Sequence, residues 1–111
     1  MRKLRVGVIF GGRSGEHEVS LASARSVMGA MDPEKYEVVP IGITKAGVWL
    51  ASGNPMEALA SGDLSLTAPA TLLADPSRPG LMRLEERGKE TVLSLLTELD
   101  VVFPVLHGTY G

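Results

Sequence analysis

The sequence contains no cysteine, no apolar run close to the ~18 residues that a membrane span requires, and no excess of basic residues. Without cysteine there is no disulfide framework, which is compatible with the cytoplasm. The formal net charge is −2 and the lysines and arginines are scattered, so nothing favours nucleic acid as a partner. We therefore expect neither a disulfide-stabilised module, nor a membrane protein, nor a nucleic-acid binder.

The 111 residues suffice for one domain with one core, and the 44% hydrophobic and 22% charged fractions are ordinary for a globular protein. Near the start, Met1 to Lys3 precedes only a short apolar stretch that runs into a glycine-rich turn. We interpret that stretch as a strand and not as a secretory signal.

The most informative stretch lies between residues 6 and 31. Val6 to Phe10 is a mostly β-branched apolar run, which predicts a buried strand of a parallel sheet. Gly11, Gly12 and Gly15 then allow a sharp turn. A helix from about Glu16 to Met31 follows, because apolar residues recur there at helical spacing: Leu21, Ala24, Val27, Met28 and Met31.

Two nucleotide-binding motifs fail at this turn. The glycines are spaced G-G-x-x-G and not G-x-G-x-x-G, and the second predicted strand has no acid at its end, Ile41 to Thr44. A P-loop would need G-K-[ST], whereas the chain reads Ser14-Gly15-Glu16. The turn instead places Glu16 and Glu18 in the first turn of the helix, where a carboxylate complements the helix dipole.

The next segment predicts a strand, a turn, a short strand and a short helix. The strand covers residues 36–43, and Pro40 within it indicates a sheet edge or a bulge. A turn at residues 44–47 leads into a short strand at 48–51. Asn54 is then expected to cap a helix over residues 55–61.

The remaining segment gives weaker and then stronger signals. Residues 71–73 and 81–84 are possible strands that pair as a hairpin. Apolar residues at i, i+3, i+4 and i+7 predict an amphipathic helix over residues 90–99. Residues 101–106 then predict a buried strand, in which Pro104 indicates a bulge or an edge.

His107 directly follows this last strand, so we expect it at the same sheet edge as Glu16. If the two strands are neighbours, the two side chains can converge on one small ligand. The simpler alternatives are that Glu16 only caps its helix and that His107 is a structural histidine.

Two segments match a known family. The first resembles the G-G-x-S-x-E-x-E-V-S signature of D-alanine–D-alanine ligases and reads Gly11-Gly12-Arg13-Ser14-Gly15-Glu16-His17-Glu18-Val19-Ser20. The second resembles the D-V-V-F-P-x-L-H-G-x-x-G-E-D-G segment of that family and reads Asp100-Val101-Val102-Phe103-Pro104-Val105-Leu106-His107-Gly108-Thr109-Tyr110-Gly111. The given sequence stops before the E-D-G.

The resemblance implies that residues 1–111 form the N-terminal, substrate-binding domain of such a ligase. It implies a three-layer, Rossmann-like (pre-ATP-grasp) α/β fold with a mostly parallel sheet. It also implies a catalytic role for Glu16, which binds the ammonium of the first D-alanine, with Val19 and His107 lining the same subsite. No metal ligand is assigned to these residues.

The resemblance further implies a cytoplasmic homodimer that makes D-alanyl-D-alanine for peptidoglycan through an acyl-phosphate. ATP and Mg²⁺ are expected to bind to the remainder of the enzyme, so the segment alone is expected to be inactive. A D-alanine–D-lactate ligase would share these motifs. A non-catalytic α/β module that binds a small molecule is the alternative from another functional class.

Overall fold

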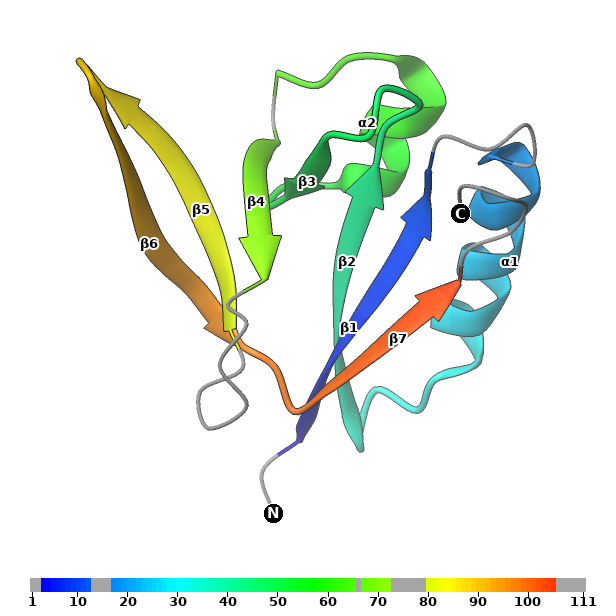
Figure 1. The fold of residues 1–111 in the computed structure, drawn as a ribbon. Coiled ribbons are helices and arrows are strands. Elements are labelled where there is room, and N and C mark those ends of the chain that lie inside the picture. Colours follow the sequence, from blue (N-terminus) through cyan, green and yellow to red (C-terminus); the bar gives the residue numbers. More distant parts are fainter. Residues whose placement is uncertain (1–2, 13–16, 66, 73–79, 106–111) are drawn as a thin grey trace.

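The computed structural model describes residues 3–12, 17–65, 67–72 and 80–105 (Figure 1). The described strands form one sheet with the order β6-β5-β4-β3-β2-β1-β7. The elements in chain order are β1 (Leu4–Gly11), α1 (His17–Ala30), β2 (Tyr36–Ile43), β3 (Trp49–Ala51), α2 (Pro55–Ser61), β4 (Ala68–Leu72), β5 (Gly80–Arg87), β6 (Glu90–Glu98) and β7 (Val101–Val105). Neither helix is long and apolar enough, in this described part of the chain, to cross a membrane.

The sheet is of mixed direction and not mostly parallel. β1 is parallel to both of its neighbours, β2 and β7, whereas every pairing from β2 to β6 is antiparallel. The turns after β2 and β5 are only a few residues long and can join only antiparallel strands, whereas the parallel strands β1 and β2 are connected through α1. β3 and β4 are antiparallel although the longer segment between them contains α2. The α/β class itself is confirmed.

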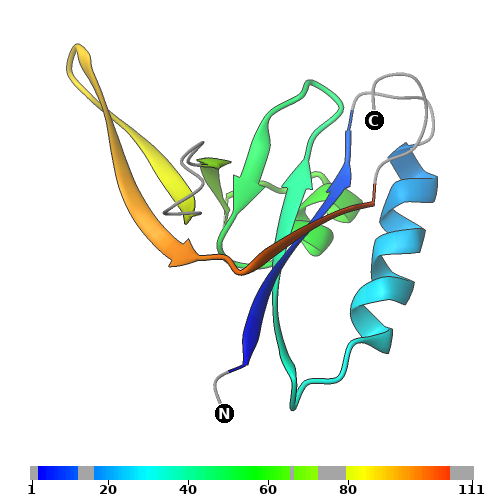
Figure 2. The same cartoon turned by 60° about the horizontal axis from the view of Figure 1, so that its bottom comes forward.

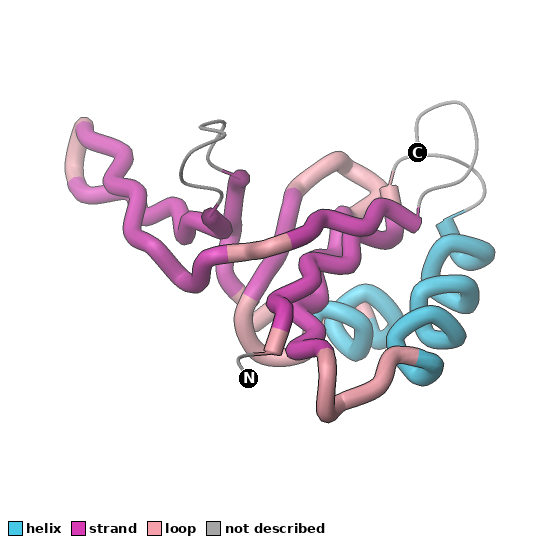
Figure 3. Tube along the Cα trace, turned by 90° about the horizontal axis from the view of Figure 1, so that it is seen from below, coloured by secondary structure: helices cyan, strands magenta, loops and turns pink. Residues whose placement is uncertain are grey.

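Both helices pack on one face of the sheet, α1 against β1 and β7 and α2 against β2 (Figure 3). That face carries a core whose buried members are Val6, Val8, Phe10, Leu21, Ala24 and Val105. The opposite face has a second core, of Ile9, Ile41, Ile43, Ala51, Ala70, Leu81 and Leu99, to which the curving strands β4 and β5 contribute. The described residues thus form two layers, and no third, helical layer is found among them.

The helices and strands predicted for the first half of the chain are confirmed within the described residues. β2 has the predicted limits, and α2 begins after Asn54, whose Oδ1 accepts a hydrogen bond of 3.1 Å from the Glu57 backbone N–H. At Pro40 the prediction of an edge holds only locally. β2 lies inside the sheet, but β3 pairs only with Gly42 and Ile43, so no ladder donor is needed from Pro40 on that side.

The predicted helix over residues 90–99 is wrong, because this segment is strand β6. Arg87 pairs with Glu90, so Gly88 and Lys89 form a two-residue hairpin turn, and Gly88 has the positive φ of 64° that such turns require. The register shifts opposite Leu81 and Met82, which pair with Thr97 and Leu95. This irregularity breaks the alternation of the strand and gives its leucines a helix-like spacing.

The strand predicted over residues 101–106 is β7, and it is an edge strand as Pro104 indicates. The prediction that it is buried is wrong, since its first four residues are exposed and only Val105 is buried. The reason is its position: β7 has a partner on one side only, and α1 reaches it near Val105.

Candidate functional site

The carboxyl ends of β1 and β7 lie side by side at one edge of the sheet (Figure 1). The two strands are parallel, and their register runs from Val6 opposite Val101 to Phe10 opposite Val105. α1 begins at the same edge and packs against both strands. The condition stated for the sequence, that the two strands are neighbours, is therefore met. This edge is the candidate site because ligands of open α/β sheets bind there.

The turn after β1 depends on glycine. Gly11 and Gly12 have φ angles of 93° and 104°, which residues with a Cβ rarely adopt. Both are buried, and the Gly12 backbone N–H donates a hydrogen bond of 2.9 Å to the Ile43 carbonyl at the end of β2. These hydrogen-bonded and buried glycines hold the start of the turn at the carboxyl ends of the three parallel strands, β2, β1 and β7.

Ser20 joins the three elements that meet at this edge. It lies in the first turns of α1 and its side chain is fully buried, with a relative exposure of 0%. Its Oγ accepts a hydrogen bond of 2.8 Å from the Gly11 backbone N–H and donates one to the Val105 carbonyl. One hydroxyl therefore connects the end of β1, the end of β7 and the start of α1.

Of the three predicted site residues, only Val19 lies among the described residues. It sits in the first turn of α1 and its exposed fraction is 50%, high for a valine. Glu16 and His107 lie outside the described residues. Their described neighbours flank the edge: His17 begins α1, and Val105, two residues before His107, ends β7.

Glu18 has the simpler role of a solvated helix residue. Its carboxylate lies 3.9 Å from the Lys45 ammonium, and both side chains are largely exposed. The pair borders a shallow hollow of about 300 Å³ between the β2–β3 turn and α2. Such exposed pairs contribute little to binding or stability.

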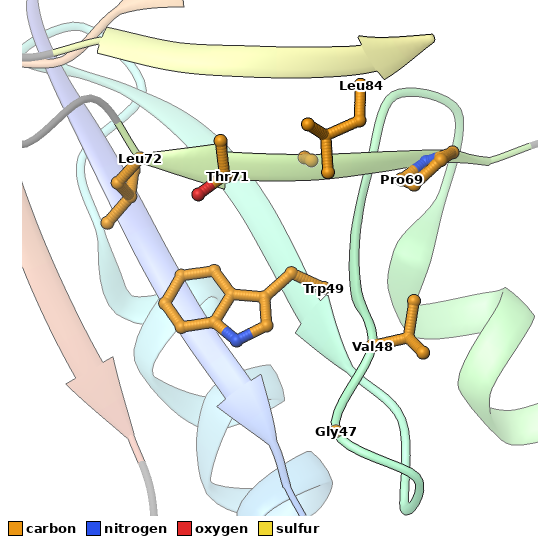
Figure 4. Close-up of a pocket in the computed structure, with 8 residues that line it drawn as sticks. Gly47, Val48, Trp49, Pro69, Thr71, Leu72 and Leu84 are labelled. Atoms are coloured by element: carbon orange, nitrogen blue, oxygen red, sulfur yellow. The ribbon is translucent and has the colours of Figure 1, made fainter. Parts of the chain in front are cut away.

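A second hollow, of about 480 Å³, lies beside β3 and β4 and contains no acid or base (Figure 4). It is lined mainly by apolar side chains, among them Trp49, Leu72 and Leu84, and its polar side-chain groups are the Thr71 hydroxyl and the Trp49 indole nitrogen (Figure 4). Its location on β3 and β4 and its chemistry give no reason to assign it a reaction.

Among the residues that the structure describes, the titratable groups form no second candidate site. Hydrogen bonds from the side chain and the backbone N–H of Ser65 lower the pKa of Asp63, which follows α2. Within the described ranges, no three His, Asp or Glu side chains lie close enough to hold a metal ion.

The sequence analysis placed Ser20 inside the signature but gave it no role. A signal was present: Ser20 precedes Leu21 on the helix face that also carries Ala24, and a polar residue on a buried face needs hydrogen-bond partners. Those partners come from β1 and β7, which the sequence pattern of the helix does not reveal.

Comparison with known proteins identifies the family. The model of the "D-ala D-ala ligase N-terminus" family matches residues 5–111. Curated relatives named D-alanine–D-alanine ligase include one from Natranaerobius thermophilus, 50% identical over the whole chain, and one from Rhodococcus jostii, 51% identical over 98% of it. The chain spans only 29% and 31% of the lengths of these two relatives.

Solved structures agree. The VanG D-Ala:D-Ser ligase from Enterococcus faecalis superimposes with a TM-score of 0.72 at 31% identity, covering 96% of this chain and 30% of the other. A D-alanine–D-alanine ligase from Coxiella burnetii gives 0.70 at 30% identity, covering 98% of this chain and 30% of the other. The chain therefore belongs to the family of D-alanine–D-alanine ligase N-terminal domains.

Proposed function

We propose that this chain is the N-terminal domain of an ATP-dependent D-alanine–D-alanine ligase. The observation that carries the proposal is the match of residues 5–111 to the family model, together with relatives of that name at about half identity. The remaining seven-tenths of the relatives' length would then supply the other domains.

The proposed reaction has two steps. A carboxylate oxygen of the first D-alanine attacks the γ-phosphorus of ATP, which gives an acyl-phosphate and releases ADP. The amine of the second D-alanine attacks the acyl carbon, phosphate leaves, and the nitrogen loses a proton. The product is D-alanyl-D-alanine, used for peptidoglycan in the cytoplasm of the cell.

This segment is proposed to contribute part of the first D-alanine subsite. The Glu16 carboxylate binds the ammonium group through charge-assisted hydrogen bonds and so orients the substrate. Val19 and His107 line the same subsite. Two described features support this: the exposed Val19 side chain at the start of α1, and the adjacent carboxyl ends of β1 and β7, to which the neighbouring Ser20 is hydrogen-bonded.

ATP and Mg²⁺ are proposed to bind to the rest of the enzyme. The glycine-rich turn matches neither nucleotide motif. The described residues do not fit a metal site either, since no cluster of three acidic or histidine side chains exists among them. We therefore assign no step through ATP or Mg²⁺ to this chain and expect the chain to be inactive alone. Separately, we propose that the whole enzyme is a homodimer.

The test includes a second acceptor, because the solved structure with a TM-score of 0.72 is a D-Ala:D-Ser ligase. The amine of D-serine would attack the same acyl-phosphate. D-Lactate, the acceptor expected of a D-alanine–D-lactate ligase, would attack through its hydroxyl and give an ester.

The test is phosphate release from ATP by the full-length enzyme, with D-alanine alone and with D-serine or D-lactate added. We expect release that depends on D-alanine alone, with the dipeptide identified by mass spectrometry. A mixed product would assign the enzyme to the other acceptor. Phosphate release that is unchanged by all three substrates would contradict the proposal and favour a non-catalytic binding module.

A further inference from the structure

We infer that Ser20 is a positioning residue for the first D-alanine subsite, because its hydroxyl fixes the strand ends that precede Glu16 and His107 in the chain. This inference rests on the proposed function, since it concerns the geometry of that same subsite. Ser20 itself is buried and is not proposed to touch the substrate.

The Ser20 hydroxyl forms hydrogen bonds with two backbone groups. It accepts from the Gly11 backbone N–H at 2.8 Å and donates to the Val105 carbonyl, so one donor and one acceptor of the backbone depend on it. No buried side-chain oxygen or nitrogen lacks a partner in the described part of the chain. Removing this hydroxyl would leave a buried N–H and a buried C=O without their partner.

The pairing of β1 with β7 does not itself depend on Ser20. Their ladder spans five residue pairs, and its other end is fastened separately. There the Arg5 backbone N–H donates to Asp100 Oδ2 at 2.7 Å, while the Asp100 backbone N–H donates to the Arg5 carbonyl at 2.8 Å. Loss of the Ser20 hydroxyl should therefore loosen only the carboxyl ends of the strands.

Those ends are where the proposed subsite begins. The chain leaves β1 at Gly11 five residues before Glu16, and leaves β7 at Val105 two residues before His107. A shift of either strand end would therefore displace the chain close to Glu16 or His107. Misplacement of binding groups by about 1 Å is known to cost up to about 100-fold in rate.

The experiment compares Ser20→Ala with wild type in the full-length enzyme, at a temperature well below the midpoint of thermal unfolding of each. We expect kcat/KM for the first D-alanine to fall about 10- to 100-fold, chiefly through a higher KM. The KM for ATP should stay within about twofold, because ATP is proposed to bind elsewhere. Ser20→Thr, which keeps the hydroxyl, should recover most of the loss.

Two control variants distinguish a positioning role of Ser20 from a general loss of stability. Ser26→Ala makes the same change at an exposed position of α1 and should leave all constants unchanged. Val27→Ala reduces the packing of α1 against the sheet and keeps the two hydrogen bonds of the Ser20 hydroxyl. It should lower the unfolding temperature while leaving kcat/KM for D-alanine within about twofold.

Two results would overturn the positioning role while the proposed function stands: normal constants for Ser20→Ala, or an equal fall in Val27→Ala. If Ser20→Ala does not fold, Ser20→Cys keeps a similar volume with a much weaker hydrogen-bonding group and is judged by the same criteria. A wild-type enzyme without D-alanine-dependent turnover would instead overturn the proposed function, and the positioning role with it.

Discussion

The two flanks of the sheet are built on different principles. β2, β1 and β7 are parallel, and α1 connects β1 to β2. They carry a core on the helical face that includes the fully buried Phe10. The β5–β6 hairpin at the other flank projects from the body of the sheet (Figure 2). Its ladder is long, but most of β6 is exposed, with Leu95 at 56%.

The difference concerns what holds each backbone in place. On the parallel flank, burial and the hydrogen bonds of Ser20 to Gly11 and Val105 fix the strand ends. A binding site requires such a rigid support. On the hairpin beyond the buried Leu81, local hydrogen bonds and the Gly88 turn define the strands with little burial. We therefore expect substitutions to matter for stability and activity on the parallel flank and to matter little at the exposed positions of β6.

The largest expected effect is that of Phe10→Ala on the 111-residue chain. Because Phe10 is completely buried between β1 and α1, the substitution should lower the free energy of unfolding by about 3–5 kcal/mol, measured by urea titration. The matched control is Phe103→Ala on β7, whose side chain is 46% exposed and should cost only about 1 kcal/mol. Equal losses would contradict the view that the core lies beneath α1.

Glu16→Gln should have the next largest effect, this time on activity. If Glu16 binds the substrate ammonium, neutralising it should lower kcat/KM for D-alanine about 100-fold, equivalent to ~2.7 kcal/mol, with little change in unfolding temperature. Steady-state kinetics of the full-length enzyme measures this.

Glu18→Gln is the matched control, since Glu18 lies two residues from Glu16 and, among the described residues, forms an exposed pair with Lys45. It should change kcat/KM by less than about twofold, given the small worth of such pairs. A large loss of stability in Glu16→Gln with normal turnover would assign Glu16 to helix capping.

The parallel flank was predictable from sequence because its signals are local. A β-branched run, glycines at a turn and helical spacing from Leu21 to Met31 give the limits of β1 and α1 within a few residues. The adjacency of β1 and β7 could only be a hypothesis, because strand order depends on contacts between residues some 95 positions apart, such as Arg5 and Asp100.

The hairpin was not predictable in the same way. β6 is a strand because β5 lies beside it, and its broken alternation imitates a helix when the sequence is considered alone. Likewise, the apolar residues of β7 predict burial, but burial depends on what else covers the strand. The role of Ser20 was missed for the same reason, since its partners lie on other elements.

The smallest expected effect is that of Leu95→Thr on the hairpin, and it is the sharpest test of the comparison. Threonine suits a strand, and Leu95 is largely exposed, so the unfolding free energy of the 111-residue chain should change by no more than about 0.5 kcal/mol. The same substitution in the full-length enzyme should leave its unfolding temperature, its molecular mass in solution and its kcat/KM unchanged. A fall in unfolding temperature or a change in mass of the full-length enzyme only would mean that another domain or a second copy covers Leu95. The hairpin would then be an interface of the enzyme, and Leu95 would be exposed in the 111-residue chain but covered in the full-length enzyme.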